Sequence, residues 1–186
     1  MRKLIFGINL TMDGCCDHTK GKSNEDVHKY FAQVLREADT LLYGRKTYEL
    51  MVPYWPEVAK AQSGPTQALN DFANAFASID NIVVCSRTLE KVEGKNTSII
   101  SGNLEEEILK LKRQPGGNIS TGGVDIPSQL IALGLVDEYH FVIQPIMVGA
   151  GRRFLDNTNL EESLQLKLVD SRVFDSGYVA LKYENQ

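Results

Sequence analysis

Two short segments contain residues whose types and spacing could bind the phosphate groups of a ligand. The first, residues 44–47, begins with Gly44 at the point where a predicted strand gives way to a predicted helix. Free backbone N–H groups and the positive end of the helix dipole favour an anion there. The side chains of Arg45, Lys46 and Thr47 would add hydrogen-bond donors. The alternative interpretation is a glycine turn followed by a solvated basic helix start.

The second segment, residues 121–123, also lies between a predicted strand and a predicted helix. After Thr121, the paired glycines Gly122 and Gly123 would let a pyrophosphate approach the main chain without a Cβ in the way. A tight turn without a ligand is the simpler alternative. Because the C-terminal ends of the strands line one crevice in an open α/β sheet, we expect both segments to face one dinucleotide.

A third segment, Ser86 to Thr88, directly follows a buried strand predicted at Asn81–Cys85 and lies at a corresponding edge. Arg87 with the flanking Ser86 hydroxyl could hold a ribose 2′-phosphate, because a guanidinium group matches phosphate geometry. An ordinary polar loop is the alternative here.

Asp13 is the polar side chain that we expect in a substrate pocket, since it leaves the first predicted strand beside Gly14. A carboxylate at this point could orient an amide or a hydroxyl, or relay a proton. A plain Asp-Gly turn explains the same residues equally well. Trp55 could cover a flat ring, although a lone tryptophan between prolines is more often a packing residue.

The elements that must position these residues alternate between short β-rich runs and helical patterns, which is typical of an α/β domain. Pro53 and Pro56 are expected to end one short helix and to lead into a polar loop. The predicted strands are residues 3–10, 40–43, 81–85, 97–100, 118–121 and 136–145. The predicted helices are residues 45–51, 65–78, 104–112 and 126–133, with a further helix capped by Ser23.

The last third of the chain changes character, because leucines at 164, 166 and 168 alternate with polar residues. A turn at residues 175–177 then leads into an apolar run at 178–183, which predicts an antiparallel hairpin. We therefore expect one α/β domain over residues 1–186, with a mostly parallel sheet, helices on both faces and an antiparallel C-terminal hairpin.

The composition excludes several classes of protein. The 186 residues are 42% hydrophobic and carry a net charge of −4, which rules out a disordered or fibrous chain. Basic residues form no extended cluster along the chain, so we expect no nucleic-acid partner. Uncharged stretches fall far short of the roughly 20 residues that span a membrane. Three cysteines and three histidines form no metal-ligand spacing and no disulfide framework, so we expect no metal and a cytoplasmic protein.

These segments, in this order and with these flanks, resemble the dihydrofolate reductase-like superfamily. The resemblance is strongest to the branch related to the reductase half of the bifunctional riboflavin-pathway deaminase-reductase, the RibD C-terminal domain family, and it extends over about residues 3–183. The segments that carry it are LTMDG at 10–14, YGRKTYE at 43–49, YWP at 54–56, VCSRTL at 84–89, TGG at 121–123, LVDEY at 135–139 and PIMVGAG at 145–151.

The resemblance implies a three-layer dihydrofolate reductase-like fold that binds NADPH and transfers its hydride to a small heterocyclic substrate of the pteridine or aminopyrimidine type. The riboflavin-pathway example is 5-amino-6-(5-phosphoribosylamino)uracil reductase. The implied cofactor residues are Gly44, Arg45, Lys46, Thr47, Ser86, Arg87, Thr121, Gly122, Gly123 and Val124. The implied substrate-side residues are Asn9, Asp13, Tyr48 and Trp55, with Asp13 and Asp26 as candidate catalytic acids.

Two departures from the family pattern bear on the substrate. The chain lacks the zinc deaminase signature, so we do not expect the bifunctional enzyme. Residues 48–57 replace an aspartate-rich segment that leads to a phosphate-gripping arginine, so the sequence does not support a phosphoribosyl substrate. Dihydrofolate reductases place a carboxylic acid inside the first helix, where this chain offers Glu25, Asp26 and the nearby His28.

Three alternatives remain open beside the reductase. The chain could be a nucleotide-binding protein of the same fold without turnover, or a dihydrofolate reductase proper. It could also be a structural subunit whose apolar strand surface, residues 141–148, contacts a partner copy. A homodimer is expected and is compatible with all of these.

Overall fold

In a computed structural model of the protein, eight strands of the described chain form one sheet in the order β4-β3-β2-β5-β1-β6-β8-β7. The structure describes residues 1–92, 94, 96–156, 158 and 160–186. The strands are β1 (Leu4–Thr11), β2 (Ala38–Gly44), β3 (Asn81–Cys85), β4 (Thr97–Ile100), β5 (Asn118–Thr121), β6 (Glu138–Gln144), β7 (Leu166–Val173) and β8 (Val179–Asn185). The helices are α1 (Glu25–Arg36), α2 (Arg45–Met51), α3 (Trp55–Ala61), α4 (Gln67–Ala77), α5 (Leu104–Arg113) and α6 (Asp125–Ala132).

Strand directions match the prediction from the sequence. Every pairing from β4 across to β6 is parallel, whereas β8 runs antiparallel to both β6 and β7. The predicted mostly parallel α/β sheet with an antiparallel C-terminal hairpin is therefore confirmed.

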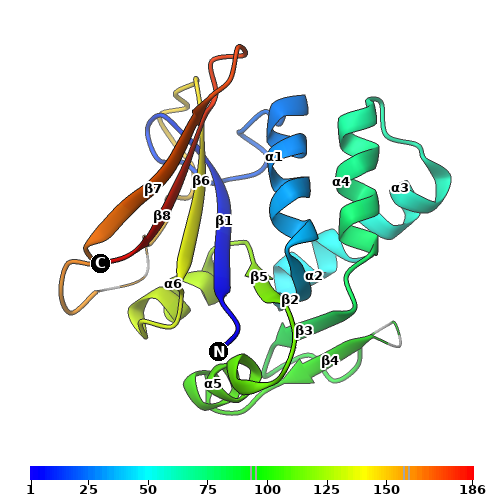
Figure 1. Cartoon of the computed structure of the whole chain (residues 1–186), viewed down its shortest axis with the longest axis vertical. Coiled ribbons are helices and arrows are strands. Elements are labelled where there is room, and N and C mark those ends of the chain that lie inside the picture. Colours follow the sequence, from blue (N-terminus) through cyan, green and yellow to red (C-terminus); the bar gives the residue numbers. More distant parts are fainter. Residues whose placement is uncertain (93, 95, 157, 159) are drawn as a thin grey trace.

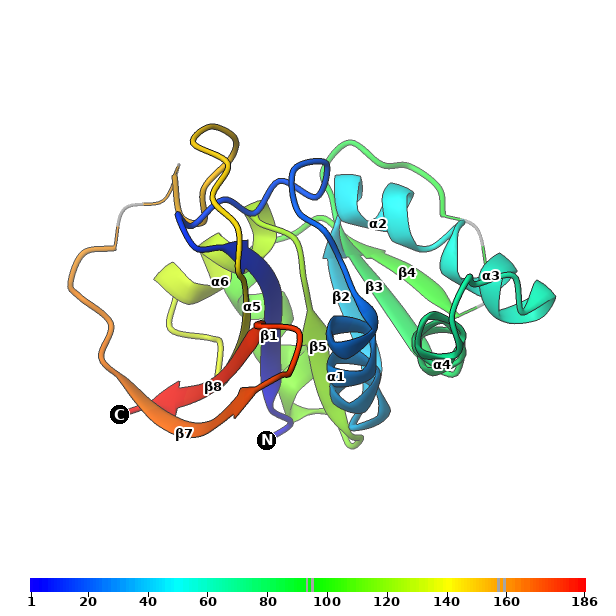
Figure 2. The same ribbon diagram turned by 90° about the horizontal axis from the view of Figure 1, so that it is seen from above.

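Helices cover both faces of the sheet, with α1 and α4 on one side and α5 and α6 on the other (Figure 1, Figure 2). Alternate residues of β2 show why two layers form. Leu41 and Tyr43 pack with the α1 and α4 side chains, whereas Leu42 packs with Ile108 of α5 and Leu130 of α6. Full burial of one such side chain contributes about 1.5–3 kcal/mol to stability.

Capping side chains begin α1, α4 and α5, and for α1 and α4 the start differs from the prediction. Asn24, and not Ser23, caps α1, because its Oδ1 accepts a hydrogen bond from the Val27 N–H at 3.0 Å. Likewise α4 begins after Thr66, whose hydroxyl accepts from the Leu69 N–H at 3.3 Å, so Pro65 precedes the cap and does not open the helix.

The polar loop predicted after Pro56 is wrong, because residues 55–61 form the helix α3. Pro56 lies in the first turn of α3, where its missing N–H would have had no partner inside the helix. Trp55 holds this helix against α4, with its ring centroid 4.6 Å from that of Phe72.

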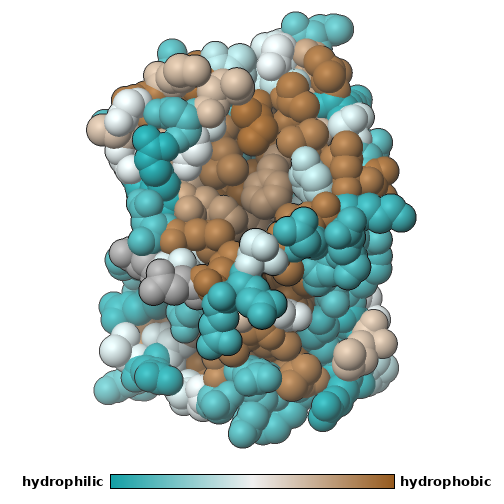
Figure 3. Space-filling view, turned by 90° about the vertical axis from the view of Figure 1, so that its left-hand side faces the viewer, coloured by the Kyte–Doolittle hydropathy of each residue, from teal (hydrophilic) through white to brown (hydrophobic). Residues whose placement is uncertain are grey.

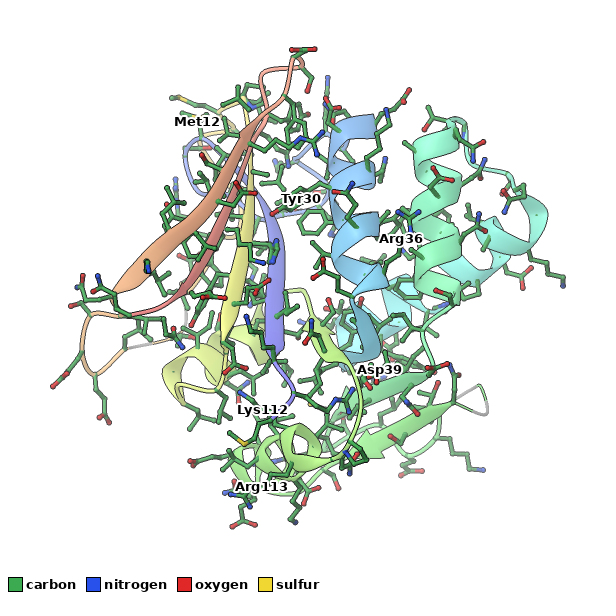
Figure 4. All side chains as sticks on the ribbon, viewed as in Figure 1. Met12, Tyr30, Arg36, Asp39, Lys112 and Arg113 are labelled. Atoms are coloured by element: carbon green, nitrogen blue, oxygen red, sulfur yellow. The ribbon has the colours of Figure 1, made fainter. Side chains whose placement is uncertain are left out.

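A buried polar network ties α1 to the sheet. Glu138 at the start of β6 is 3% exposed, and its Oε1 lies 2.7 Å from His140 Nε2 and 2.9 Å from Lys182 Nζ. The other ring nitrogen of His140 lies 2.7 Å from the hydroxyl of Tyr30, which reaches from α1 toward the sheet (Figure 4). Burial alone would raise the pKa of Glu138, but the hydrogen bonds from His140 and Lys182 lower it to about 2.

Figure 3 shows a largely apolar, hollowed surface on the side of the molecule that carries β7 and β8. Leu166 and Tyr183 from these strands pack partly against the core around Phe6, and Leu168 is 50% exposed. Residues 141–148, the expected contact surface for a partner copy, are only partly available. Phe141 already packs against Phe6 within the chain, whereas Met147 is 76% exposed. The homodimer stays a prediction.

None of the helices in the described parts of the chain has the length and apolar character needed to cross a lipid bilayer.

Glu138→Gln should destabilise the protein at neutral pH. The pKa of Glu138 is about 2 in the folded state against an ordinary value of 4.5, so its contribution of about 3 kcal/mol is present above pH 4.5 and is lost as the pH falls toward 2. Urea unfolding at several pH values between 3 and 7 follows the onset of this loss in the free energy of unfolding. The variant should also show a flatter acid dependence than the parent protein.

Glu184→Gln is the matched control, because the Glu184 carboxylate is 39% exposed and pairs with Lys3 at the surface. Its cost should stay below about 1 kcal/mol. An acid dependence that is the same in Glu138→Gln as in the parent would contradict the role given to Glu138.

Candidate active site

The three predicted phosphate-binding segments lie at one edge of the sheet. Strand β2 has β3 and β5 as its neighbours, and all three run parallel. Their C-terminal ends therefore deliver Gly44, Ser86 and Gly122 to the same edge. The loops after β1 and β6 lie on the same side of the molecule as α2 (Figure 2), so five connections surround this edge.

The two glycine turns are packed against each other. Gly123 has a φ of +85°, and a Cβ on it would collide with the Thr47 hydroxyl. A Cβ on Gly44 would lie 2.9 Å from Cγ1 of Ile126 at the start of α6. Both glycines are thus required by the close approach of the two turns.

Gly122 differs from its neighbours because packing does not require a glycine there. Among the described residues, a Cβ on Gly122 would meet only the Gly7 carbonyl oxygen at 3.6 Å and Tyr43 Cε1 at 3.8 Å, which are ordinary contact distances. What the missing side chain provides is main chain that a ligand can approach closely. This observation fits a phosphate group lying on residues 121–124.

The basic side chains of the site lie at its surface. Arg45 Nε donates to Glu49 Oε1 at 2.7 Å, and its Nη1 donates to Thr88 Oγ1 at 3.3 Å, so Arg45 bridges α2 and the loop after β3. In that loop, the Ser86 hydroxyl accepts from the Thr88 N–H at 3.2 Å and from the Leu89 N–H at 3.0 Å. Ser86 therefore shapes the loop that presents Arg87, whose side chain is exposed, as is that of Lys46.

Asn9 lies near the end of β1 on the face that is turned toward α1. Gly7 shares this face, since a Cβ on it would lie 2.8 Å from Cε1 of Phe31, and alternate residues of a strand point the same way. The side-chain oxygen of Asn9 is buried and has no hydrogen-bond partner among the residues that the structure describes. A buried acceptor without a partner is costly, so this oxygen marks a place where a ligand N–H or O–H would fit.

Asp13 anchors the loop that follows β6. Its carboxylate accepts hydrogen bonds from the Thr11 hydroxyl at 2.5 Å, the Gly149 N–H at 2.8 Å and the Val148 N–H at 3.3 Å. The bonds from Thr11 and Gly149 lower the pKa of Asp13 to about 2. The guanidinium of Arg153 donates to the carbonyl oxygen of Asp13 as well. Asp13 thus stays ionised and joins two loops.

The second candidate acid, Asp26, lies in the first turn of α1 and accepts a hydrogen bond from Ser176 Oγ at 2.5 Å. Ser176 belongs to the turn between β7 and β8. Asp26 therefore holds α1 against the tip of the hairpin.

The two aromatic candidates of the substrate side are packed into the structure. Tyr48 is buried in the core cluster between α1, α4 and the sheet. Trp55 Nε1 donates to Met51 Sδ at 3.3 Å, and its ring contacts Phe72 and, at a centroid distance of 6.4 Å, His28 of α1. Burial lowers the pKa of His28, which favours its neutral form.

Sequence reasoning missed Arg152. Its guanidinium forms an ion pair with Asp125, the first residue of α6, immediately after the second glycine turn. The sequence signal was two arginines directly after the glycine-rich residues 149–151, although nothing local pointed to Asp125 as the partner.

Comparison with other proteins gives two relatives of similar length. A protein of Bacillus subtilis (strain 168), named uncharacterized protein YyaP, is 31% identical over 193 aligned residues that cover 98% of this chain and 94% of YyaP. A crystal structure of a Shewanella sp. PV-4 protein, described as a candidate riboflavin biosynthesis protein, has a TM-score of 0.73 at 19% identity and covers 99% of each chain.

Two further structures share the fold. The deaminase and 5-amino-6-(5-phosphoribosylamino)uracil reductase of Thermotoga maritima matches all of this chain and 57% of its own, with a TM-score of 0.69 at 14% identity. The dihydrofolate reductase of Enterococcus faecalis, solved in complex with NADP(H), has a TM-score of 0.64 at 16% identity over 99% of this chain and 96% of its own. The dihydrofolate reductase-like fold is therefore confirmed.

The family described as RibD C-terminal domain matches residues 2–180, which is nearly the whole chain. The motifs around Gly44, Arg87 and Gly122 lie within that match and converge at one edge of the sheet. The protein accordingly belongs to the RibD C-terminal domain family.

Proposed function

We propose that this protein is an NADPH-dependent reductase of a small heterocyclic substrate. The observation that carries the proposal is the convergence of the segments that begin at Gly44, Ser86 and Thr121 at one edge of the sheet, where the contacts around Gly122 do not require a glycine. Family membership and the reductase names of structural neighbours support the same reaction class. A fold of this kind hosts other functions too, so the site residues carry the argument.

The residues of the site suit a nicotinamide dinucleotide phosphate. The main chain and side chains of residues 44–47 and 121–124 would hold the phosphates, and Arg87 beside Ser86 would meet the ribose 2′-phosphate. When bound, the cofactor supplies the hydride, and the protein holds it against the substrate.

The substrate that this site favours is a flat heterocycle of the aminopyrimidine or pteridine type. Asn9 offers a buried oxygen acceptor at the end of β1, which would pair with an N–H of such a ring. Asp13 takes part as the anchor of the loop after β6, since its oxygens already accept three hydrogen bonds within the chain.

One observation favours a second candidate, a nucleotide-binding protein of the same fold without turnover. The carboxylates of Asp13 and Asp26 already accept hydrogen bonds from other parts of the chain. The pKa of Asp13 is also too low for this residue to donate a proton at neutral pH. A reductase would then take its proton from water or from the substrate itself.

Purified protein should bind NADPH more tightly than NADH, because only NADPH carries the 2′-phosphate that Arg87 would meet. Arg87→Ala should weaken NADPH binding by about tenfold and leave NADH binding nearly unchanged, whereas Arg45→Ala should weaken both. Calorimetric titration measures these affinities. Arg113→Ala, an exposed arginine at the end of α5, is the control that should change neither.

If the protein binds neither NADPH nor NADH, both hypotheses are wrong: the reductase and the nucleotide-binding protein without turnover. Binding of NADPH without oxidation by dihydrofolate or by the riboflavin-pathway pyrimidine would favour the binding protein.

Asn9→Leu should leave NADPH binding intact and keep or raise the melting temperature, because it removes a buried oxygen that lacks a partner. Turnover of a heterocyclic substrate should fall by about tenfold or more in kcat/KM, since the substrate N–H loses its acceptor. Thermal unfolding and steady-state kinetics measure the two effects. A lower melting temperature together with unchanged kcat/KM would show that Asn9 is a structural residue.

Asp13→Asn should loosen the loop after β6, because a neutral amide accepts hydrogen bonds more weakly than a carboxylate. The amides of Val148 and Gly149 should exchange with deuterium faster than in the parent protein, which mass spectrometry measures. Asp17→Asn is the matched control, as the hydrogen bonds of its carboxylate to described residues stay within its own turn, at Thr19. Equal exchange in Asp13→Asn and the parent would argue against the anchoring role.

A further inference from the structure

We propose that Arg152 is a further cofactor-binding residue, which exchanges its partner Asp125 for the pyrophosphate of the bound nucleotide. The inference rests on the proposed function, and it adds a residue from the loop after β6 to a site otherwise built from the ends of β2, β3 and β5.

The ion pair between Arg152 and Asp125 lies next to the second glycine turn. Asp125 directly follows residues 121–124, and both guanidinium ends of Arg152 reach its carboxylate, with Nη1 3.4 Å from Oδ2. Arg152 therefore brings a positive charge to Asp125, directly after the second glycine turn at residues 121–124. Asp125 brings a negative charge to the same place, and that charge would repel a pyrophosphate unless a cation stays close.

The backbone of Arg152 is fixed, so only its side chain has to move. The Cys16 N–H donates to the carbonyl oxygen of Arg152 at 2.8 Å, and Cys15 forms a β-bridge with Arg153. Asp13 holds the same loop through the amides of Val148 and Gly149. A guanidinium pivoting on an anchored backbone loses little conformational freedom on binding.

The present partner of Arg152 is replaceable. The Arg152 side chain is 36% exposed and that of Asp125 is 53% exposed, and ion pairs in such contact with water contribute little to stability. A pyrophosphate offers more negative charge and a geometry that the planar guanidinium can contact through two N–H groups at once. Asp125 keeps a favourable position at the N-terminus of α6 after Arg152 has left it.

A double-mutant cycle tests whether Arg152 contacts the phosphate or only neutralises Asp125. The NADPH dissociation constant is measured for the parent, Arg152→Ala, Asp125→Asn and the double variant. Arg152→Ala should weaken binding by about tenfold, and Asp125→Asn should strengthen it by a few-fold. The decisive comparison is the double variant against Asp125→Asn, which should again differ by about tenfold.

If the double variant binds NADPH as tightly as Asp125→Asn, Arg152 only screens the carboxylate and the inference is overturned. Arg153→Ala is the matched control, since that arginine points to Asp13, and it should bind NADPH as the parent does. The melting temperature of Arg152→Ala should match that of the parent, because the ion pair is exposed, and that of Asp125→Asn should be slightly lower, because the variant loses the favourable charge at the N-terminus of α6.

A second probe, 2′-AMP, carries the adenosine 2′-phosphate without the pyrophosphate. Its affinity should be unchanged in Arg152→Ala and reduced in Arg87→Ala; loss of 2′-AMP binding in Arg152→Ala would overturn the assignment to the pyrophosphate. A parent protein that binds neither NADPH nor 2′-AMP would instead contradict the proposed function itself, so the two failures are distinguishable.

Discussion

The parallel direction of β1, β2, β3 and β5 is the constraint on which the site depends. Parallel neighbours must each return through a crossover, so every strand end on one edge is followed by a connection on that edge. The strand order interleaves β5 between β1 and β2, which brings the turn at Gly122 between the end of β1 and the turn at Gly44. Residues more than 70 positions apart, such as Thr47 and Gly123, consequently share one surface.

Local sequence patterns were sufficient for much of the fold. The strands Asn81–Cys85, Thr97–Ile100 and Asn118–Thr121 begin and end as predicted, because short apolar runs between polar turn residues admit few alternatives. The helix α3 was missed because Pro56 is compatible both with the end of one helix and with the first turn of the next. Only the packing of Trp55 on Phe72 decides between these possibilities.

The chemistry of single side chains was harder to predict, because their partners are distant in the sequence. Asp13 looked like part of an Asp-Gly turn or a catalytic acid, yet its oxygens meet amides of Val148 and Gly149. Asp26 similarly meets Ser176, and Asp125 meets Arg152. The local sequence shows where a carboxylate lies along the chain. The fold determines which N–H and O–H groups donate hydrogen bonds to it.

The Glu138, His140 and Tyr30 network has a consequence for how this fold can diversify. The network fixes α1 on the sheet from within, and the Asn24 cap begins the helix independently of what precedes it. Within the connection between β1 and α1, Asp13, Cys15 and Cys16 hold the loop after β6, and Lys22 bonds to Gln144 and Tyr178, whereas residues 18–20 are exposed. Insertions or replacements at residues 18–20 can therefore change the surface on this side of the molecule while the helix and the loop after β6 stay in place, so the family can vary here without refolding the domain.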